Sequence, residues 1–195
     1  MTGAAVDGAQ EASLRPHADE LVGLAEAAID HGLARGEPAA PELDGVPEAL
    51  RAVRGAFVTL RREGELRGCI GTIEAHRPLA ADVTANAFGA AFRDPRFPPV
   101  SAEERSGLTL KIEVLTTPEP LAFAGEEDLL AQLRPGTDGL LIEAAGRKGT
   151  FLPTVWEQLP EPRAFWTHLK RKAGLPADYS SAAMAVYRYR TEVLP

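Results

Sequence analysis

The only cysteine of this chain, Cys69, lies in the run LRGCIG, residues 66–71. A lone cysteine forms no internal disulfide, so its thiol either fills space or does chemistry. The thiolate is the reactive form, and a nearby cation such as the Arg67 guanidinium favours it. Gly68 and Gly71 carry no side chains, so a substrate or a partner's backbone could approach the sulfur closely. The alternative is a small buried residue in a tight strand, because free cysteine is among the most buried residue types.

A cysteine nucleophile also needs a base within hydrogen-bond reach. The chain has four histidines. His168 is the most interesting of them, because it sits beside the basic run 170–172, whereas His76 is the nearest to Cys69 along the chain. The competing interpretation of His168 is an amphipathic helix whose basic end complements its own dipole.

Asp94 and Arg96 belong to a proline-rich loop, residues 93–99. A stiff loop can hold charged groups at a site, since loops often carry function. The same residues could equally form a structural turn closed by an internal Arg–Asp pair. The candidate sets are therefore catalytic Cys69, Arg67 and His168, and substrate- or partner-binding Gly68, Gly71, Asp94 and Arg96.

Motifs for metals and cofactors are not found in the sequence. One cysteine and scattered histidines give no CxxC or HExxH spacing. There is no phosphate-binding loop, no GxGxxG and no GxSxG. The basic turn 146–149 could hold an anion, but such a turn is weak evidence. We therefore predict no metal and no cofactor.

Composition places the chain among ordinary globular proteins. It has 195 residues, of which 45% are hydrophobic and 25% charged. A net charge of −7 argues against sequence-independent nucleic-acid binding, which requires a basic surface. No apolar stretch is long enough to span a membrane, and one cysteine fits a reducing compartment, so we expect a cytoplasmic protein. We expect residues 1–16 to be a disordered leader and residues 17–195 to form one domain.

The candidate residues must be positioned by a mixture of helices and strands. Helical spacing of apolar residues predicts helices over 17–35, 78–92, 126–133 and 163–173. Strand-like runs, clearest at 108–114 where apolar and polar residues alternate, predict strands over 56–62, 66–72, 108–114, 140–144 and 187–193. In the strand 66–72, strict alternation would put Arg67, Cys69 and Gly71 on one face. Hairpins without regular βαβ repetition favour an α+β fold with an antiparallel or mixed sheet.

Several of these motifs, taken in order, closely resemble the AMMECR domain family, whose prokaryotic members are also called AmmeMemoRadiSam system protein A. The resemblance spans roughly residues 17–194, and the motifs that carry it are residues 66–71, 91–99, 149–153 with Val155 and Trp156, 168–169 with 172–175, and 187–189. It implies an α+β fold of two unequal lobes with the cysteine motif lining a cleft. The family's biochemical function is not established. Its name implies partnership with a Memo-like protein and a radical S-adenosylmethionine enzyme in a modification pathway.

Two functional hypotheses remain open at this point. In the first, the chain is an enzyme or a substrate-holding partner that uses Cys69, with Arg67 activating the thiol. In the second, it is a non-catalytic adaptor or regulatory protein that docks a partner through the same surface. Nucleic-acid binding ranks last because of the negative net charge.

Overall fold

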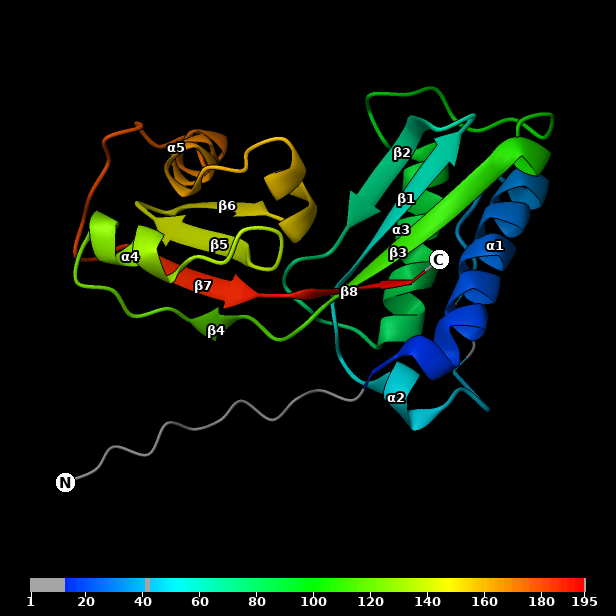
Figure 1. Cartoon of the computed structure of the whole chain (residues 1–195). Coiled ribbons are helices and arrows are strands. Elements are labelled where there is room, and N and C mark those ends of the chain that lie inside the picture. Colours follow the sequence, from blue (N-terminus) through cyan, green and yellow to red (C-terminus); the bar gives the residue numbers. More distant parts are fainter. Residues whose placement is uncertain (1–12, 41–42, 195) are drawn as a thin grey trace.

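Two four-stranded antiparallel sheets organise the protein, each with its own hydrophobic core (Figure 1). The computed structural model describes residues 13–40 and 43–194. Every strand pair in both sheets is antiparallel. With the helices that cover the sheets, this confirms the predicted α+β class.

The first sheet has the strand order β2-β1-β3-β8. Its three long strands run within one residue of the predicted ranges, and two of them contribute buried aliphatic side chains to the core. Its members are β1 (Ala56–Arg62), β2 (Glu65–Gly71), β3 (Leu108–Leu115) and the short β8 (Thr191–Leu194). Because β2 is an edge strand, half of its backbone groups need partners from outside the sheet.

Two helices cover one face of the first sheet. The helix α3 (Leu79–Phe92) lies against β1 and β2, and α1 (Ala18–Arg35) packs alongside α3. α1 ends at Gly36, whose φ of 73° is the left-handed conformation that closes many helices. The short α2 (Glu48–Arg51) precedes β1. Across the described ranges, no helix has both the length and the apolar character needed to cross a membrane.

The second sheet has the order β4-β7-β5-β6. Its strands are β4 (Glu119–Pro120), β5 (Gly139–Ala144), β6 (Arg147–Phe151) and β7 (Ala185–Tyr189), and its helices are α4 (Glu126–Gln132) and α5 (Pro162–Lys172). Its core combines aliphatic with aromatic side chains, and the Trp156 ring stacks on Phe165 with centroids 3.8 Å apart. Trp166, fully buried on α5, completes this core.

The second sheet is an insertion between β3 and β8, as the chain path in Figure 1 shows. Only two linkers join it to the first sheet, residues 116–118 and Arg190. They bind each other, because the Thr116 N–H donates to the Arg190 carbonyl and the Arg190 N–H donates to Thr116 Oγ1, both at 2.9 Å. The two sheets therefore meet at a double linker.

The C-terminal segment corrects one sequence expectation. The single strand predicted over 187–193 is divided at Arg190 into β7 of the second sheet and β8 of the first. Tyr189 pairs with Gly139, whereas Thr191 pairs with Leu115. The side-chain alternation continues through this point, so the pattern could not reveal that the pairing partner changes.

The segment around residue 150 is a second correction. We expected a turn over 146–149 and a helical region from Thr150 onward, but the turn lies at Ala145–Gly146, where both residues have positive φ. β6 follows it directly. A Cβ on Gly149 would overlap Ala173 at the end of α5, so this glycine lets the strand lie close to the helix.

Part of the expected leader falls within the described residues. Residues 1–12 lie outside the described residues, but Leu14 is only 2% exposed and packs in the first core. Its N–H donates to Glu192 Oε2 at 2.9 Å, and the Ser13 hydroxyl donates to the same carboxylate. Residues 13–16 are therefore part of the folded structure.

Candidate functional site

Cys69 lies on the face of the first sheet that is turned away from α3. Its neighbour Gly68 faces α3, and successive residues of a strand point to opposite faces. The cross-strand pairs place Thr59 and then Lys111 beside Cys69, with Phe57 and Glu113 in the adjacent row. Phe57 packs with the cluster that joins the two sheets. We call this surface, which carries Phe57, Thr59, Cys69, Lys111 and Glu113, the inner face.

Cys69 is a partly buried residue, and its thiol receives one hydrogen bond from the inner face. Thr59 Oγ1 donates to Cys69 Sγ at 3.3 Å. The backbone of Cys69 is held from outside the sheet, because its N–H donates to Asp94 Oδ2 at 2.8 Å and Arg96 Nη2 donates to its carbonyl at 3.4 Å. The sulfur therefore has a fixed position at the sheet edge.

Asp94 and Arg96 form the internal pair that was one of the two interpretations of their loop. Two hydrogen bonds of 2.9 and 2.6 Å join the guanidinium to the carboxylate. The pKa of Asp94 is held far below its usual range, first by the Arg96 hydrogen bond and then by the Cys69 N–H, against an opposing effect of burial. The loop thus covers the open edge of β2 at Cys69, which is a way to protect an edge strand.

Arg67 does not lie beside the thiol, so the expected activation of Cys69 by Arg67 is wrong in its geometry. Leu60 pairs with Gly68 and Arg61 with Leu66, which leaves Arg67 as an extra residue without a partner on β1. Such a β-bulge breaks the alternation and redirects a side chain. Arg67 instead makes hydrogen bonds of 2.8 and 2.9 Å to the Glu104 carboxylate and donates to the carbonyls of residues 98 and 99.

The Arg67–Glu104 pair predicts a pH dependence of stability. The Arg67 hydrogen bonds are the main cause that lowers the pKa of Glu104 from 4.5 to about 2. Because the folded-state pKa lies below the unfolded one, the pair stabilises the fold above about pH 4.5, and this stabilisation is lost as the pH falls towards 2. In urea titrations, Glu104→Gln should be less stable than the natural protein at pH 7, and the gap should close on acidification. A gap that stays constant down to pH 2 would contradict the assignment.

Protein atoms fill the space beside each glycine of the motif. This corrects the expectation that the glycines leave room for a substrate. A Cβ on Gly68 would overlap the carbonyl oxygen of Ala90 in α3, and one on Gly71 would overlap the ring of Phe57. The first glycine lets β2 approach α3, and the second lets the Phe57 ring lie over the strand. Their absent side chains serve packing on the two faces of β2.

His168 is exposed on α5, and its side chain makes no hydrogen bond or ion pair with any residue in the described part of the chain. The basic run beside it is divided between two environments. Lys170 is fully buried and binds Glu126 Oε2 at 2.8 Å. Lys172, one turn beyond His168 on the same side of the helix, lies over the Phe151 ring and interacts electrostatically with Cys69. In the described structure, no contact joins His168 to Cys69.

Lys172 is the residue near the thiol that the sequence did not single out. Its ammonium lies 5.0 Å from the centroid of the Phe151 ring and within Coulombic range of Cys69. The residue as a whole is exposed, yet protein atoms crowd its ammonium, and this desolvation lowers the pKa of Lys172 while Cys69 opposes the shift. This cation comes from α5, which packs on β6 of the second sheet, and not from the strand that carries the thiol.

The inner face also carries an ion pair between Lys111 and the buried Glu113. Lys111 Nζ lies 3.1 Å from Glu113 Oε2, and Glu113 is 3% exposed. Glu113 Oε1 has no hydrogen-bond partner among the described residues. Tyr189, which comes from β7, is buried nearby, and burial raises the pKa of its hydroxyl. The Tyr189 hydroxyl donates to the Phe151 carbonyl at 3.0 Å, so this end of the inner face is closed by the second sheet.

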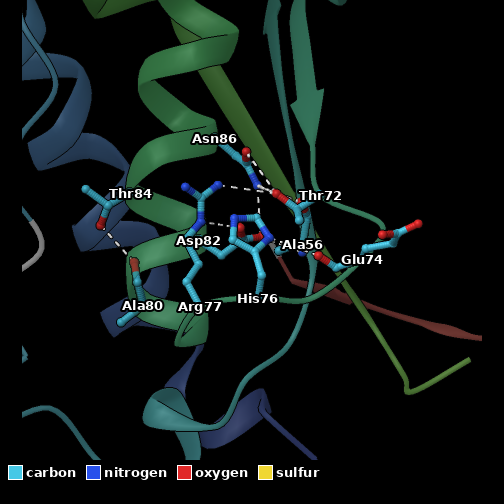
Figure 2. A network of polar contacts seen from close by, with 9 residues as sticks. All are labelled: Ala56, Thr72, Glu74, His76, Arg77, Ala80, Asp82, Thr84 and Asn86. Carbon is cyan, nitrogen blue, oxygen red and sulfur yellow. Dashed lines mark hydrogen bonds and ion pairs between the residues drawn. The ribbon is translucent and has the colours of Figure 1, made fainter.

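A buried polar network holds the other end of β2 (Figure 2). Asp82 of α3 is fully buried and accepts hydrogen bonds from the Ala56 N–H, from Asn86 Nδ2 and from Arg77 Nε, at 2.9, 2.9 and 2.7 Å. Asn86 Nδ2 also donates to the Ala56 carbonyl at 2.9 Å and lies 3.2 Å from the hydroxyl of Thr72, just beyond β2. The network thereby fixes the start of β1 against the end of β2.

Two cavities flank the linkers between the sheets. One of about 330 Å³ is lined by Ile73, Leu115, Pro118 and Leu141 among others, and one of about 270 Å³ by Thr154 and Arg190 among others. Neither is lined by a residue of Leu66–Gly71. Within residues 13–40 and 43–194, no group of three or more His, Cys, Asp or Glu side chains is arranged to hold a metal ion.

Comparison with known proteins places this chain in a wider group. The family model described as AMMECR1 matches residues 22–194. A protein of Methanothermobacter thermautotrophicus is 38% identical over 175 residues, which cover 89% of this chain and 91% of that protein. One of Thermotoga maritima is 38% identical, covering 76% of this chain and 82% of its own length. The crystal structure of an uncharacterized protein from Pyrococcus horikoshii superposes with a TM-score of 0.83 at 34% identity, covering 92% of this chain and 91% of that one.

Proposed function

The chain belongs to the AMMECR1 family, and on that premise we propose that it works in a modification pathway through the thiol of Cys69. Its partners in this proposal are a Memo-like protein and a radical S-adenosylmethionine enzyme. The observation that carries the proposal is the setting of Cys69. The residue is partly buried, its sulfur accepts a hydrogen bond from Thr59, and it interacts electrostatically with Lys172 and with Arg96, which is itself paired with Asp94. The thiolate is the nucleophilic form of a cysteine side chain.

Alkylation of the folded protein tests the reactivity of this thiol. Iodoacetamide should modify the natural protein near pH 7, and intact mass should show a single adduct. The rate should rise with pH as the thiolate fraction grows. Cys69→Ser should give no adduct, because the chain has no other cysteine. A folded protein that stays unmodified near neutral pH would rule out the thiol as the working group.

One observation favours the second candidate, an adaptor that docks a partner through the same surface. His168 is not shown beside the sulfur, and protein atoms fill the spaces at Gly68 and Gly71, so the described structure shows no base next to Cys69. The same variant separates the two functions. If Cys69→Ser captures the Memo-like protein as well as the natural chain does, and the natural thiol resists iodoacetamide, the adaptor function holds.

A further inference from the structure

The two edges of the first sheet differ in how they are covered. The loop that carries Asp94 and Arg96 closes the edge of β2. β8 forms the opposite edge, and among the described residues it pairs with β3 alone (Figure 1). A strand edge without a neighbour presents a row of N–H and C=O groups to which another chain can bind, and proteins commonly block such edges. In the described structure the edge of β8 therefore has room for an added strand.

The register shows which backbone groups of β8 are free. The Thr116 N–H donates to the Arg190 carbonyl, and in an antiparallel pair every second residue is hydrogen-bonded to the residue opposite. Residues two and four positions after Arg190 therefore bond to β3, whereas the N–H and C=O groups of Thr191 and Val193 point outward. No hydrogen bond among the described residues occupies these outward groups.

The other side of β3 gives the same result. The Leu115 N–H donates to the Gly55 carbonyl at 2.9 Å, on the side of β1. Leu115 lies opposite Thr191, so its backbone groups face β1 and do not bind Thr191. Two separate hydrogen bonds thus give the same outward direction for the backbone groups of Thr191.

A cavity of about 270 Å³ lies along this edge. Thr191 and Val193 line it from β8, and Thr137 and Glu157 line it from the part of the chain that carries the second sheet. Since Leu194 packs in the first core, Thr191 and Val193 point to the inner face. Val193 is 44% exposed, which leaves an apolar side chain uncovered beside the cavity. In an added strand, the side chains opposite Thr191 and Val193 would lie over this cavity.

The polar groups of the cavity indicate which side chain fits. Arg190 brings guanidinium donors and Glu157 brings carboxylate acceptors, and both residues are exposed and form no ion pair within the described ranges. A carboxamide carries both a carbonyl acceptor and N–H donors, so it can bind both groups. A carboxylate in the same place would be repelled by Glu157, and an ammonium would be repelled by Arg190.

We propose that the free edge of β8 takes an extended segment of another protein as an additional strand, with an Asn or Gln side chain of that segment in the cavity. Main-chain hydrogen bonds would supply affinity and the cavity would supply specificity. A second copy of this chain is a poorer occupant, because β8 has only four residues and a stable dimer needs a much larger buried surface. This surface lies at the opposite sheet edge from Cys69, so the inference goes beyond the proposed function.

Hydrogen exchange of the natural chain tests the free edge directly. The amides of Glu192 and Leu194 bond to β3 and should exchange slowly, whereas those of Thr191 and Val193 should exchange about tenfold faster or more. If all four amides are equally protected, the edge is already covered and the inference is overturned.

A short peptide tests the added strand. The probe is acetyl-Thr-Val-Gln-Val-Thr-amide, titrated to millimolar concentration while the amide signals of β8 are followed by NMR. We expect saturable shifts at Thr191 and Val193. N-methylation of the Gln removes an N–H that faces β8 and should weaken binding about five- to tenfold, the effect of one hydrogen bond. N-methylation of a Val, whose N–H faces away, is the matched control and should leave the affinity unchanged.

The side chain in the cavity is tested with the same peptide. Replacement of its Gln by Glu or by Lys should weaken binding, whereas replacement by Asn should keep most of it. Peptides that bind equally well with Gln, Glu and Lys would contradict the assignment of the cavity.

Variants of β8 complete the test. Val193→Pro removes an outward N–H and spares the bonds to β3, so the fold should persist while peptide affinity falls about five- to tenfold. Val193→Thr keeps the N–H and should bind like the natural chain. Cys69→Ser should also bind normally, which separates this inference from the function of the thiol. No saturable shift in β8, equal binding by Val193→Pro, or a dimer that only Val193→Pro dissociates would each overturn the inference.

Discussion

Gly68→Ala is expected to lower the free energy of unfolding by about 2–3 kcal/mol, because overpacked sites force the backbone apart. The added Cβ would fall well inside the 3.0 Å that real Cβ contacts keep from the carbonyl oxygen of Ala90. Backbone atoms of α3 and β2 cannot move aside as the end of a flexible side chain can. In an ordinary strand position the same change would be neutral or stabilising, since glycine loses more chain entropy on folding. A loss of stability is therefore diagnostic of the close approach.

Gly23→Ala is the matched control. Gly23 lies within α1 with no atom near the position of an added Cβ, so this substitution should stabilise the protein by roughly 0.5–1 kcal/mol. Urea denaturation followed by circular dichroism measures both variants. If Gly68→Ala were as stable as the natural protein, α3 and β2 would not lie as close together in solution as described.

Asp82→Ala should cost about 3 kcal/mol of stability, because it leaves buried donors without an acceptor and a partly buried cation without its partner. The donors are the Ala56 N–H and Asn86 Nδ2, and the cation is Arg77. Since the Arg77 side chain is 32% exposed, water compensates part of the loss, and we do not expect the larger effect of a fully buried pair. Cys69 should also become more accessible to alkylation as the anchor of its strand loosens.

The comparison for Asp82 is an aspartate in an exposed ion pair. Asp30 pairs with Arg105, but its side chain is 56% exposed, so Asp30→Ala should change stability by less than about 1 kcal/mol. Thermal or urea unfolding of the two variants side by side gives the difference. Equal losses in the two would show that the hydrogen bonds of Figure 2 are not the source of the stabilisation.

Local sequence patterns predicted much of the fold because they report on burial and on turns. α1 and its end at Gly36 were predicted within one residue at each boundary, and β1, β2 and β3 nearly as closely. The alternation in β3 reflects a strand with one face against the core, and the glycine reflects a left-handed cap. The same local signals could not predict β6, because residues 147–149 read equally well as a turn.

The site was predicted less completely, and the β-bulge at Arg67 explains why. A regular hairpin with its turn at 63–64 would pair Thr59 with Gly68 and keep Arg67 on the face of Cys69. The extra residue shifts the pairing by one, so Thr59 faces Cys69 and Arg67 turns outward to Glu104. The bulge depends on the pairing of β2 with β1 and leaves the apolar Leu66 36% exposed, so the residue pattern of β2 could not locate it.

The sequence by itself determined the AMMECR1 family, the α+β class and most element boundaries. The tertiary structure alone decided which groups surround the thiol: Thr59 through the shifted register, Asp94 and Arg96 through the loop at the strand edge, and Lys172 through α5 of the inserted sheet. The physical reason is the distance along the chain over which each kind of interaction acts. Propensity, alternation and capping act between residues close in the chain, whereas strand register and the docking of an inserted sheet depend on contacts between residues far apart in it.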